Sequence, residues 1–249
     1  MTIKYYTDLI QGSDEWLQAR CGLLTASEMK LIISPPPEPE TRIKKNGELY
    51  KQREWNIAAD DDKCRSHLYE LLAQRVTKYV EPHYIGDDML RGQVDEIEAR
   101  NVYAKNIAPV SEMGFITNDR WGFTIGYSPD GLIGNDGLIE CKSRRQKYQV
   151  ETLLENVESR TVPVDYLMQI QTALIVSERE WVDFISYSGG LPMVVIRAYP
   201  DKKIQDAIIE AATQFEARIA TKKKALQEIM NADYRLFPTE RRIEEDMVI

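Results

Sequence analysis

The sequence predicts an α/β or α+β domain in which helices surround a small, mixed, central β-sheet. Its 249 residues, 43% of them hydrophobic, suffice for one domain with a substantial core. Helical patterns come first along the chain, and a group of short apolar strand patterns follows them. A long helical pattern comes after the last strands. We therefore expect a single domain over residues 1–249.

The first third of the chain predicts short helices and an exposed insertion. Residues 14–20 read as a short helix, and Thr25-Ala26-Ser27-Glu28 has the Ser/Thr-x-x-Glu form of a capping box that opens a second one. The proline run at residues 35–39 cannot continue a helix. We therefore expect an exposed insertion loop over about residues 34–61.

The remaining patterns alternate between strands and helices. Their order is helices at 62–79 and 88–106, strands at 109–117, 121–127 and 137–143, a helix at 164–176, strands at 181–187 and 193–199, and a helix at 201–231.

Composition excludes several classes of protein. No apolar run reaches the ~18 residues of a membrane span, and the first residues lack a signal-peptide core, so we expect a cytoplasmic protein. The three cysteines are scattered, which excludes a disulfide framework and a four-cysteine metal site. A net charge of −8 argues against nonspecific coating of DNA, but a nuclease can concentrate its positive charge in one groove.

The most informative motif is Ser128-Pro129-Asp130-Gly131 followed by Glu140-Cys141-Lys142. The turn at residues 134–137 predicts a hairpin that places Asp130 beside Glu140. Side chains alternate along a strand, so Glu140 and Lys142 share one face and Cys141 points to the core. The alternative is an ordinary hairpin with an exposed Glu/Lys pair.

This arrangement suits metal-dependent cleavage of a phosphodiester. Mg²⁺ is commonly held by one or two carboxylates, water and substrate phosphate. Asp130 and Glu140 could supply the carboxylates, and Lys142 could orient or deprotonate the attacking water.

Other segments supply groups that a phosphodiesterase needs. Trp16 and Arg20 lie four residues apart, on one helical face, where an Arg fork can bind phosphate and an indole can stack on a base. The alternative is a core Trp with a surface Arg. Ser27 lies in the first turn of a helix, where an anion can bind, and its alternative role is helix capping.

Two further positions are ambiguous between site and scaffold. Glu96 lies in an acidic helix and could complete the metal site, or it could be an ordinary solvated charge. Gln169 and Gln171 interrupt an apolar helix and need polar partners, which could be a ligand or the protein itself. His67 and His83 are isolated, and we assign neither a role.

Taken in chain order, these residues resemble those of the phage lambda-type exonucleases, the viral-recombinase branch of the restriction-endonuclease-like nucleases. The resemblance covers about residues 8–187. It rests on Gly12, Trp16, Arg20, Gly22 and Thr25 to Glu28, then Gly92, Glu96, Ala99 and Arg100, then Ser128 to Gly131, Glu140, Lys142, Gln169 and Gln171.

The resemblance implies a restriction-endonuclease-like fold and a processive exonuclease. Such an enzyme digests one strand of linear duplex DNA from the 5′ end and leaves a 3′ single-stranded tail. It also implies a ring-shaped homotrimer, a single-strand annealing protein as partner, and a phage or prophage gene in a bacterial host.

By matched position, the resemblance assigns the metal site. Asp130, Glu140, Glu96 and the backbone carbonyl of Cys141 would bind Mg²⁺ in a two-ion site, with Mn²⁺ as an alternative ion. Lys142 would activate the nucleophilic water. Cys141 replaces a more usual apolar residue, and a backbone ligand should tolerate that change.

The resemblance also implies a pocket for the 5′ phosphate, formed by Arg20, Ser27, Ser128 and Gln169, with Trp16 near the separated strand end. Three alternatives stay open. They are a structure-specific endonuclease of the same fold, a Cas4-like nuclease, which the lack of four clustered cysteines disfavours, and a DNA-end-binding module without catalysis.

Overall fold

Two sheets, rather than one, lie at the centre of the protein. The computed structural model describes residues 2–35, 61–82 and 86–241. Within these residues the strands form two four-stranded sheets, in the orders β1-β3-β4-β2 and β5-β6-β7-β8. The strands are β1 (Ile3–Tyr6), β2 (Leu24–Thr25), β3 (Phe115–Asn118), β4 (Ile125–Tyr127), β5 (Gly131–Ile133), β6 (Gly137–Ser143), β7 (Trp181–Tyr187) and β8 (Val194–Ala198).

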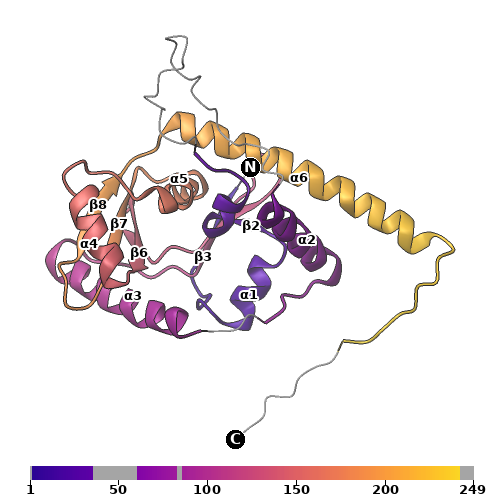
Figure 1. Cartoon of the computed structure of the whole chain (residues 1–249), viewed down its shortest axis with the longest axis horizontal. Coiled ribbons are helices and arrows are strands. Elements are labelled where there is room, and N and C mark those ends of the chain that lie inside the picture. Colours follow the sequence, from indigo (N-terminus) through magenta and orange to yellow (C-terminus); the bar gives the residue numbers. More distant parts are fainter. Residues whose placement is uncertain (1, 36–60, 83–85, 242–249) are drawn as a thin grey trace, which may run out of the picture.

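Helices cover both faces of the second sheet (Figure 1). They are α1 (Asp14–Arg20), α2 (Asp62–Thr77), α3 (Asp87–Asn106), α4 (Gln146–Glu155), α5 (Val164–Ser177) and α6 (Lys202–Asn231), with a 3₁₀ helix, η1 (Ala26–Leu31). Helix α3 packs on β6 and β7, while α4 and α5 pack on β7 from the other face. The result is the mixed α/β fold that the sequence predicts.

Strand β6 divides its side chains between these two layers. Ile139 and Cys141 pack with Ala99 and Tyr103 of α3, whereas Leu138 belongs to the larger core. Parallel pairing with β7 and antiparallel pairing with β5 make β6 an interior strand. The prediction that Cys141 faces the core and Glu140 the opposite side of the strand is therefore confirmed.

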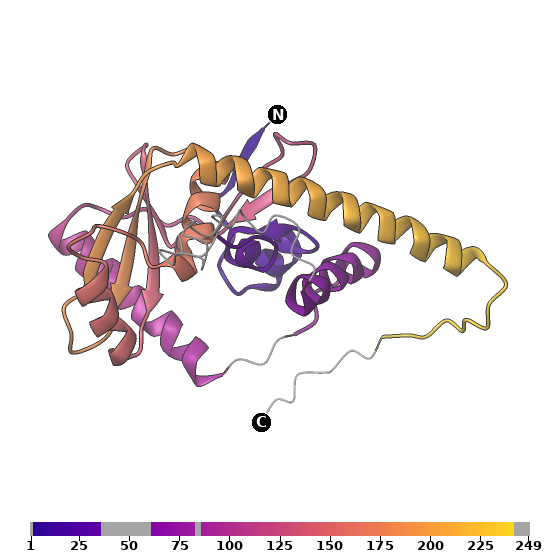
Figure 2. The same ribbon diagram turned by 45° about the horizontal axis from the view of Figure 1, so that its top comes forward.

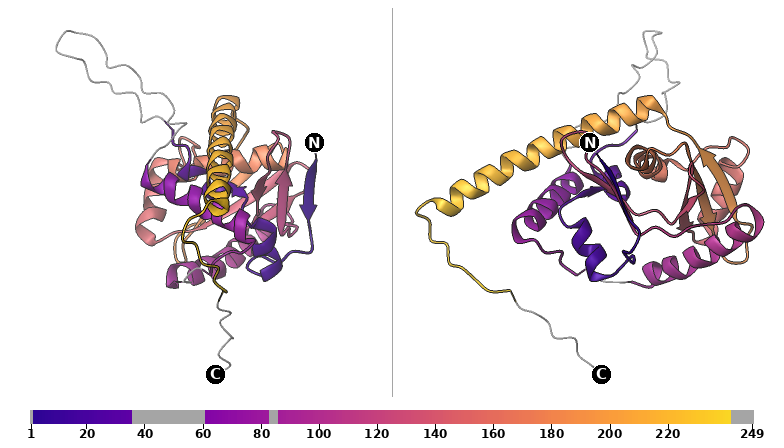
Figure 3. Two further views of the ribbon diagram at one scale, coloured as in Figure 1. Left: turned by 90° about the vertical axis from the view of Figure 1, so that its right-hand side faces the viewer. Right: turned by 180° about the vertical axis from the view of Figure 1, so that it is seen from behind.

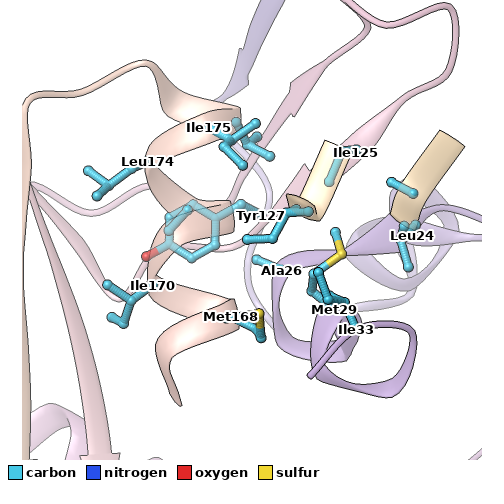
Figure 4. Packing of buried hydrophobic residues seen from close by; sticks show 14 of the residues in the cluster. Leu24, Ala26, Met29, Ile33, Ile125, Tyr127, Met168, Ile170, Leu174 and Ile175 are labelled. Atoms are coloured by element: carbon cyan, nitrogen blue, oxygen red, sulfur yellow. The ribbon is translucent and has the colours of Figure 1, made fainter. Parts of the chain in front are cut away.

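The larger core joins the two sheets through α5. Figure 4 shows the ring of Tyr127 between side chains of α5, such as Ile170 and Leu174, and those of η1, such as Met29. The hydroxyl oxygen of Tyr127 points away from η1. Because β4 ends at Tyr127, this packing fixes the point at which the chain leaves the first sheet.

Helix α6 lies along the outside of this core, against α2 and α5 (Figure 2). Arg75 of α2 donates two hydrogen bonds to Glu216 of α6, at 2.6 and 2.7 Å. The last buried residue of α6 is Ile219, and the helix then projects past the body, as the right-hand view of Figure 3 shows. In the described ranges, no helix is both long and apolar enough to cross a membrane.

Several predicted strands are shorter than expected. The strand predicted at 109–117 begins only at Phe115, and Ser111 forms an isolated bridge to Leu132. The one predicted at 121–127 begins at Ile125, because Gly122 has a φ of +81° and turns the chain before it. Helix α4 was not predicted, since the residues that it buries include the polar Gln149 and Thr152, which give no apolar period.

Two local predictions were wrong. Thr25 does not cap the following helix with its side chain, and that helix is 3₁₀ rather than α. The hairpin partner of β6 is β5, not the strand that ends at Tyr127, so Asp130 lies in the link between the two sheets. The predicted insertion at 34–61 falls mostly on residues 36–60, which lie outside the described residues.

We expect Gly126→Ala to lower the free energy of unfolding by about 1–3 kcal/mol. A Cβ at Gly126 would overlap the ring of Phe115, which is fully buried and cannot move aside. Urea unfolding followed by circular dichroism measures the change. The matched control is Gly92→Ala in α3, which has open space around it and should gain up to ~1 kcal/mol from helix propensity. Equal stability of Gly126→Ala and the wild type would contradict the close packing of β3 on β4.

Candidate active site

Asp130, Glu140 and Lys142 lie together at the junction of the two sheets. The hairpin pairs Gly131 with Ile139, which brings Asp130 next to the backbone of Cys141. The Cys141 N–H donates a 2.5 Å hydrogen bond to Oδ2 of Asp130. Nζ of Lys142 lies 2.7 Å from Oε1 of Glu140, on the face that the strand alternation predicts. The structure thus assembles the three residues that the motif singles out.

Both carboxylates are almost completely buried, with 7% of Asp130 and 2% of Glu140 exposed. Burial raises the pKa of Asp130 well above its usual range, and the negative charges of Glu140 and Glu96 raise it further. Burial by itself would lower the pKa of Lys142, but the attraction of Glu140 and Asp130 outweighs it and raises that pKa. The centre therefore concentrates negative charge that one ammonium only partly offsets.

Glu140 accepts hydrogen bonds from three elements. Besides Lys142 on its own strand, Nε2 of Gln169 on α5 donates to Oε1 at 2.5 Å. The hydroxyl of Tyr127 at the end of β4 donates to Oε2 at 2.8 Å. Burial, followed by the charges of Glu140 and Asp130, raises the pKa of Tyr127 well above 10. Sequence reasoning missed Tyr127, because a tyrosine in an apolar strand reads as core.

The two glutamines of α5 have different partners. Gln169 reaches Glu140, whereas Gln171 donates to the Tyr199 carbonyl and accepts from the Asp201 N–H. Gln171 is thus a structural residue that joins α5 to the start of α6. Gln169 lies in the centre, where its amide donates to the Glu140 carboxylate and does not contact Arg20 in the way that the resemblance implies.

Glu96 approaches the centre from α3. Its nearest cation is Arg100, with 4.0 Å between Nη2 and Oε1, and Arg100 also donates to the Asp130 carbonyl at 3.4 Å. Burial raises the pKa of Glu96, Arg100 opposes the shift, and Glu140 adds to it. The negative charge of Glu140 thus acts on the Glu96 carboxylate across the site.

The donors at this centre fit a hard divalent cation. Among the described residues, no three side chains of the types His, Cys, Asp and Glu lie close enough together to hold a metal by themselves. Mg²⁺ does not need such a set, since it keeps waters and takes one or two carboxylates. Asp130 and Glu140 are two buried oxygen ligands whose mutual repulsion a divalent cation would offset. Among the described residues, Oδ1 of Asp130 accepts no hydrogen bond, which leaves it available to such an ion.

A second group of residues lies beside the centre, on the link that carries Asp130. Ser128 Oγ accepts hydrogen bonds from Nε1 of Trp16 at 3.0 Å and from Nη1 of Arg20 at 3.2 Å. The guanidinium of Arg20 stacks on the indole of Trp16 at 4.3 Å, as their spacing on α1 allows. Burial lowers the pKa of Arg20 and Glu28 opposes this shift, but an Arg side chain stays charged.

Ser27 joins this group through Thr25. The hydroxyls of Ser27 and Thr25 are 3.2 Å apart, and Arg20 Nη2 donates to the Thr25 hydroxyl at 3.3 Å. Ser27 is exposed, so its hydroxyl is accessible to a ligand. The structure thus brings Arg20, Ser27, Ser128 and Trp16 together and places Gln169 with the carboxylates instead.

A cavity of about 800 Å³ lies beside this group. Its lining includes Trp16, Arg20, Thr25 and Glu28, together with Glu96 and Pro129, the neighbour of Ser128 and Asp130. Apolar side chains complete the wall, among them Leu9, Ile10, Leu17, Met89 and Met113. A cavity with an apolar wall and a few convergent charged groups is typical of a binding site.

Comparisons with known proteins agree with this geometry. The family model described as a YqaJ-like viral recombinase domain matches residues 15–180. The crystal structure of an alkaline exonuclease (LHK-Exo) from Laribacter hongkongensis is similar, with 26% identity and a TM-score of 0.64. The match covers 87% of this chain and 100% of that one. The same exonuclease in complex with dAMP matches over the same shares, also at 26% identity, with a TM-score of 0.65.

A phage-related exonuclease from Haemophilus somnus 129PT has the same fold. It shares 12% identity, with a TM-score of 0.53, and the match covers 83% of this chain and 96% of that one. No curated protein matches significantly. The restriction-endonuclease-like fold and the resemblance to the lambda-type exonucleases are therefore confirmed.

We expect Asp130→Asn to make the protein more stable than the wild type at pH 7–8 when divalent ions are chelated. The folded state raises the pKa of Asp130, so it binds this proton more tightly than the unfolded chain does. The wild type therefore loses stability as the pH rises from about 4, the unfolded value, through the raised folded value. Asn keeps an acceptor for the Cys141 N–H and has no charge to bury.

Urea unfolding in EDTA across pH 4–8 tests this expectation. The stability difference between the variant and the wild type should be largest at the alkaline end and should shrink toward pH 4. The exposed Asp206→Asn serves as the control. If the wild type is as stable as Asp130→Asn at pH 8, the expectation that the buried Asp130 carboxylate destabilises the folded state is wrong.

Proposed function

Because the chain belongs to the YqaJ-like viral recombinase family, we propose that it is a Mg²⁺-dependent exonuclease that degrades one strand of linear duplex DNA from its 5′ end. Degradation leaves a 3′ single-stranded tail for recombination by strand annealing. The family and the alkaline exonuclease relatives make the chain a deoxyribonuclease of recombination. Beyond this activity, we propose that the ion is Mg²⁺, that degradation starts at the 5′ end, and that the substrate is duplex DNA.

One observation carries the proposal. Ser128, which Arg20 and Trp16 contact, stands two residues before Asp130 on the same link. The proposed phosphate-binding group and the proposed cleavage group are thus joined by two residue steps, a span of at most about 7 Å. A terminal phosphate bound by Arg20 and Ser128 would place the next phosphodiester at Asp130 and Glu140. Such an arrangement favours cleavage from an end over cleavage within a strand.

The side chains suggest a division of roles. A divalent cation held by Asp130, Glu140 and the Cys141 carbonyl, with Glu96 on a second side, would stabilise the charge that develops on the phosphate oxygens. The raised pKa of Lys142 keeps it an ammonium, which suits it to orient the attacking water. Gln169 and Tyr127 hold Glu140 in place for both tasks.

The phosphate pocket uses groups that recognise a dianion. The fork of Arg20 can donate two parallel hydrogen bonds to phosphate oxygens, and the Ser128 hydroxyl can donate a further one. The Ser27 hydroxyl can donate another once it turns its proton from Thr25 to the phosphate. Trp16 stacks on the Arg20 guanidinium, and its indole would lie near the separated strand end. The dAMP that the Laribacter exonuclease binds is a nucleoside monophosphate, the product class of such an enzyme.

We extend the proposal to the assembly and its setting. The lambda-type resemblance supports a ring-shaped homotrimer, a single-strand annealing protein as partner, Mn²⁺ as an alternative ion, and a phage-encoded protein in the bacterial cytoplasm. A ring would let duplex enter the acidic protein through a channel, where positive charge is concentrated.

Digestion of a linear duplex with a 5′ phosphate on one strand tests the proposal directly. We expect mononucleotides to be released from the phosphorylated strand first, only with Mg²⁺, and a 3′ tail to remain. Gel analysis of each labelled strand follows direction and end preference together. Covalently closed circular DNA is the control. Equal cutting of the circle would favour the endonuclease, and tight end binding without any release would favour the non-catalytic module.

We expect Asp130→Ala and Lys142→Ala to lower kcat at least 100-fold, because each removes a group from the catalytic centre. Steady-state release of nucleotides from the same duplex measures the loss. Lys202→Ala, an exposed change on α6, is the matched control for removal of a lysine and should keep full activity. Retention of activity by Lys142→Ala would remove Lys142 from the mechanism.

A further inference from the structure

Glu28 makes a contact other than the helix-capping one that its sequence motif predicts. The capping-box pattern predicts that it caps a helix, yet Thr25 makes no capping hydrogen bond with its side chain. Instead, the Thr25 hydroxyl donates a 2.7 Å hydrogen bond to Oε2 of Glu28. Glu28 is partly exposed and lines the cavity next to Arg20 and Thr25. Its carboxylate therefore faces the proposed phosphate pocket.

The contact with Glu28 determines the direction of a chain of hydrogen bonds. A hydroxyl carries one proton, and Thr25 gives its proton to Glu28. The Thr25 oxygen must therefore act as the acceptor toward its other neighbours. It accepts from Nη2 of Arg20 at 3.3 Å, and the Ser27 hydroxyl, 3.2 Å away, must be the donor in that pair. Glu28 thus orients Thr25 so that it holds Arg20.

The buried side chain of His67 lies beside Glu28. His67 is 2% exposed and stacks on Phe215 of α6, with ring centroids 5.8 Å apart. Its Nε2 lies 3.8 Å from Oε2 of Glu28, and its Nδ1 lies 3.2 Å from Glu70. Within the described residues, this Nε2 has no hydrogen-bond partner. The Glu28 carboxylate lies close to this nitrogen, just beyond hydrogen-bond distance.

We propose that Glu28 is a positioning residue that orients Thr25, and thereby Arg20 and Ser27, to select ends with a 5′ phosphate. The inference rests on the proposed function, because it assigns the Arg20 pocket to a terminal phosphate. Glu28 itself does not touch that phosphate, which a carboxylate would repel. Its effect reaches the phosphate through the Thr25 hydroxyl and the Arg20 guanidinium.

Glu28→Gln tests the inference with little change of shape. The Gln amide can donate to Thr25, so Thr25 is free to turn its proton toward the Arg20 guanidinium and disturb it. We expect KM for 5′-phosphorylated duplex to rise roughly tenfold, with kcat within about twofold of the wild type. Activity on 5′-hydroxyl ends should not change. The preference for phosphorylated ends should therefore fall roughly tenfold.

Two further comparisons separate positioning from other effects. Glu228→Gln makes the same change at an exposed position on α6, away from the cavity lining, and should keep the wild-type preference. Thr25→Ser retains the hydroxyl and should keep the preference, whereas Thr25→Val should lose it as Glu28→Gln does. Melting temperatures measured on the same samples check that each variant is folded. If Glu28→Gln fails to fold, the comparison of Thr25→Ser with Thr25→Val tests the inference instead.

The outcomes are distinct. A wild type that prefers phosphorylated ends, with a Glu28→Gln variant that keeps the same preference, overturns the inference and leaves the proposed function standing. Equal loss of kcat on both kinds of end, with a lowered melting temperature, assigns Glu28 a structural role and also overturns it. A wild type without any preference overturns the phosphate pocket and the inference together.

Discussion

The burial of Asp130 and Glu140 side by side is the constraint on which the rest of the structure depends. Two carboxylates in a region of low dielectric repel each other and lose their hydration. Hydrogen bonds from the Cys141 N–H, Lys142, Tyr127 and Gln169 partly offset this cost. These donors come from β6, from the end of β4 and from α5. The centre therefore exists only when both sheets and α5 are assembled around it.

The two sheets make this assembly possible. Strand β4 ends in the first sheet at Tyr127, and β5 begins in the second at Gly131. The short link between them carries Ser128 and Asp130, so the proposed phosphate-binding group and the proposed metal-binding group share one stretch of backbone. Its ends are held by two sheets, which prevents the two groups from moving independently. This coupling is the physical basis for expecting cleavage that starts at an end.

Polar side chains inside the fold show how far local patterns can mislead. Glu28 has the spacing of a helix cap but accepts from the Thr25 hydroxyl beside the cavity. Tyr127 reads as a core residue, and its ring does lie in the core, yet its hydroxyl donates to Glu140, a carboxylate of the proposed centre. Gln169 and Gln171 look equivalent along the sequence, but one joins the centre and the other joins α5 to α6. For Tyr127, Gln169 and Gln171, the partner comes from a distant segment.

The sequence by itself determined the α/β class, most of the helices, strands β6 and β7, and the motif residues of the centre. These follow from short-range rules: the 3.6-residue helical period, the two-residue strand period, and the chemistry that carboxylates and lysine can perform. Only the tertiary structure decided that there are two sheets, that β5 is the partner of β6, and that α4 forms over buried polar residues. It also decided which donor serves which carboxylate and which hydroxyl holds Arg20. The reason is that hydrogen-bond partners and burial depend on residues far apart in the chain, such as Tyr127 and Glu140 or Arg20 and Ser128, whose proximity no local pattern encodes.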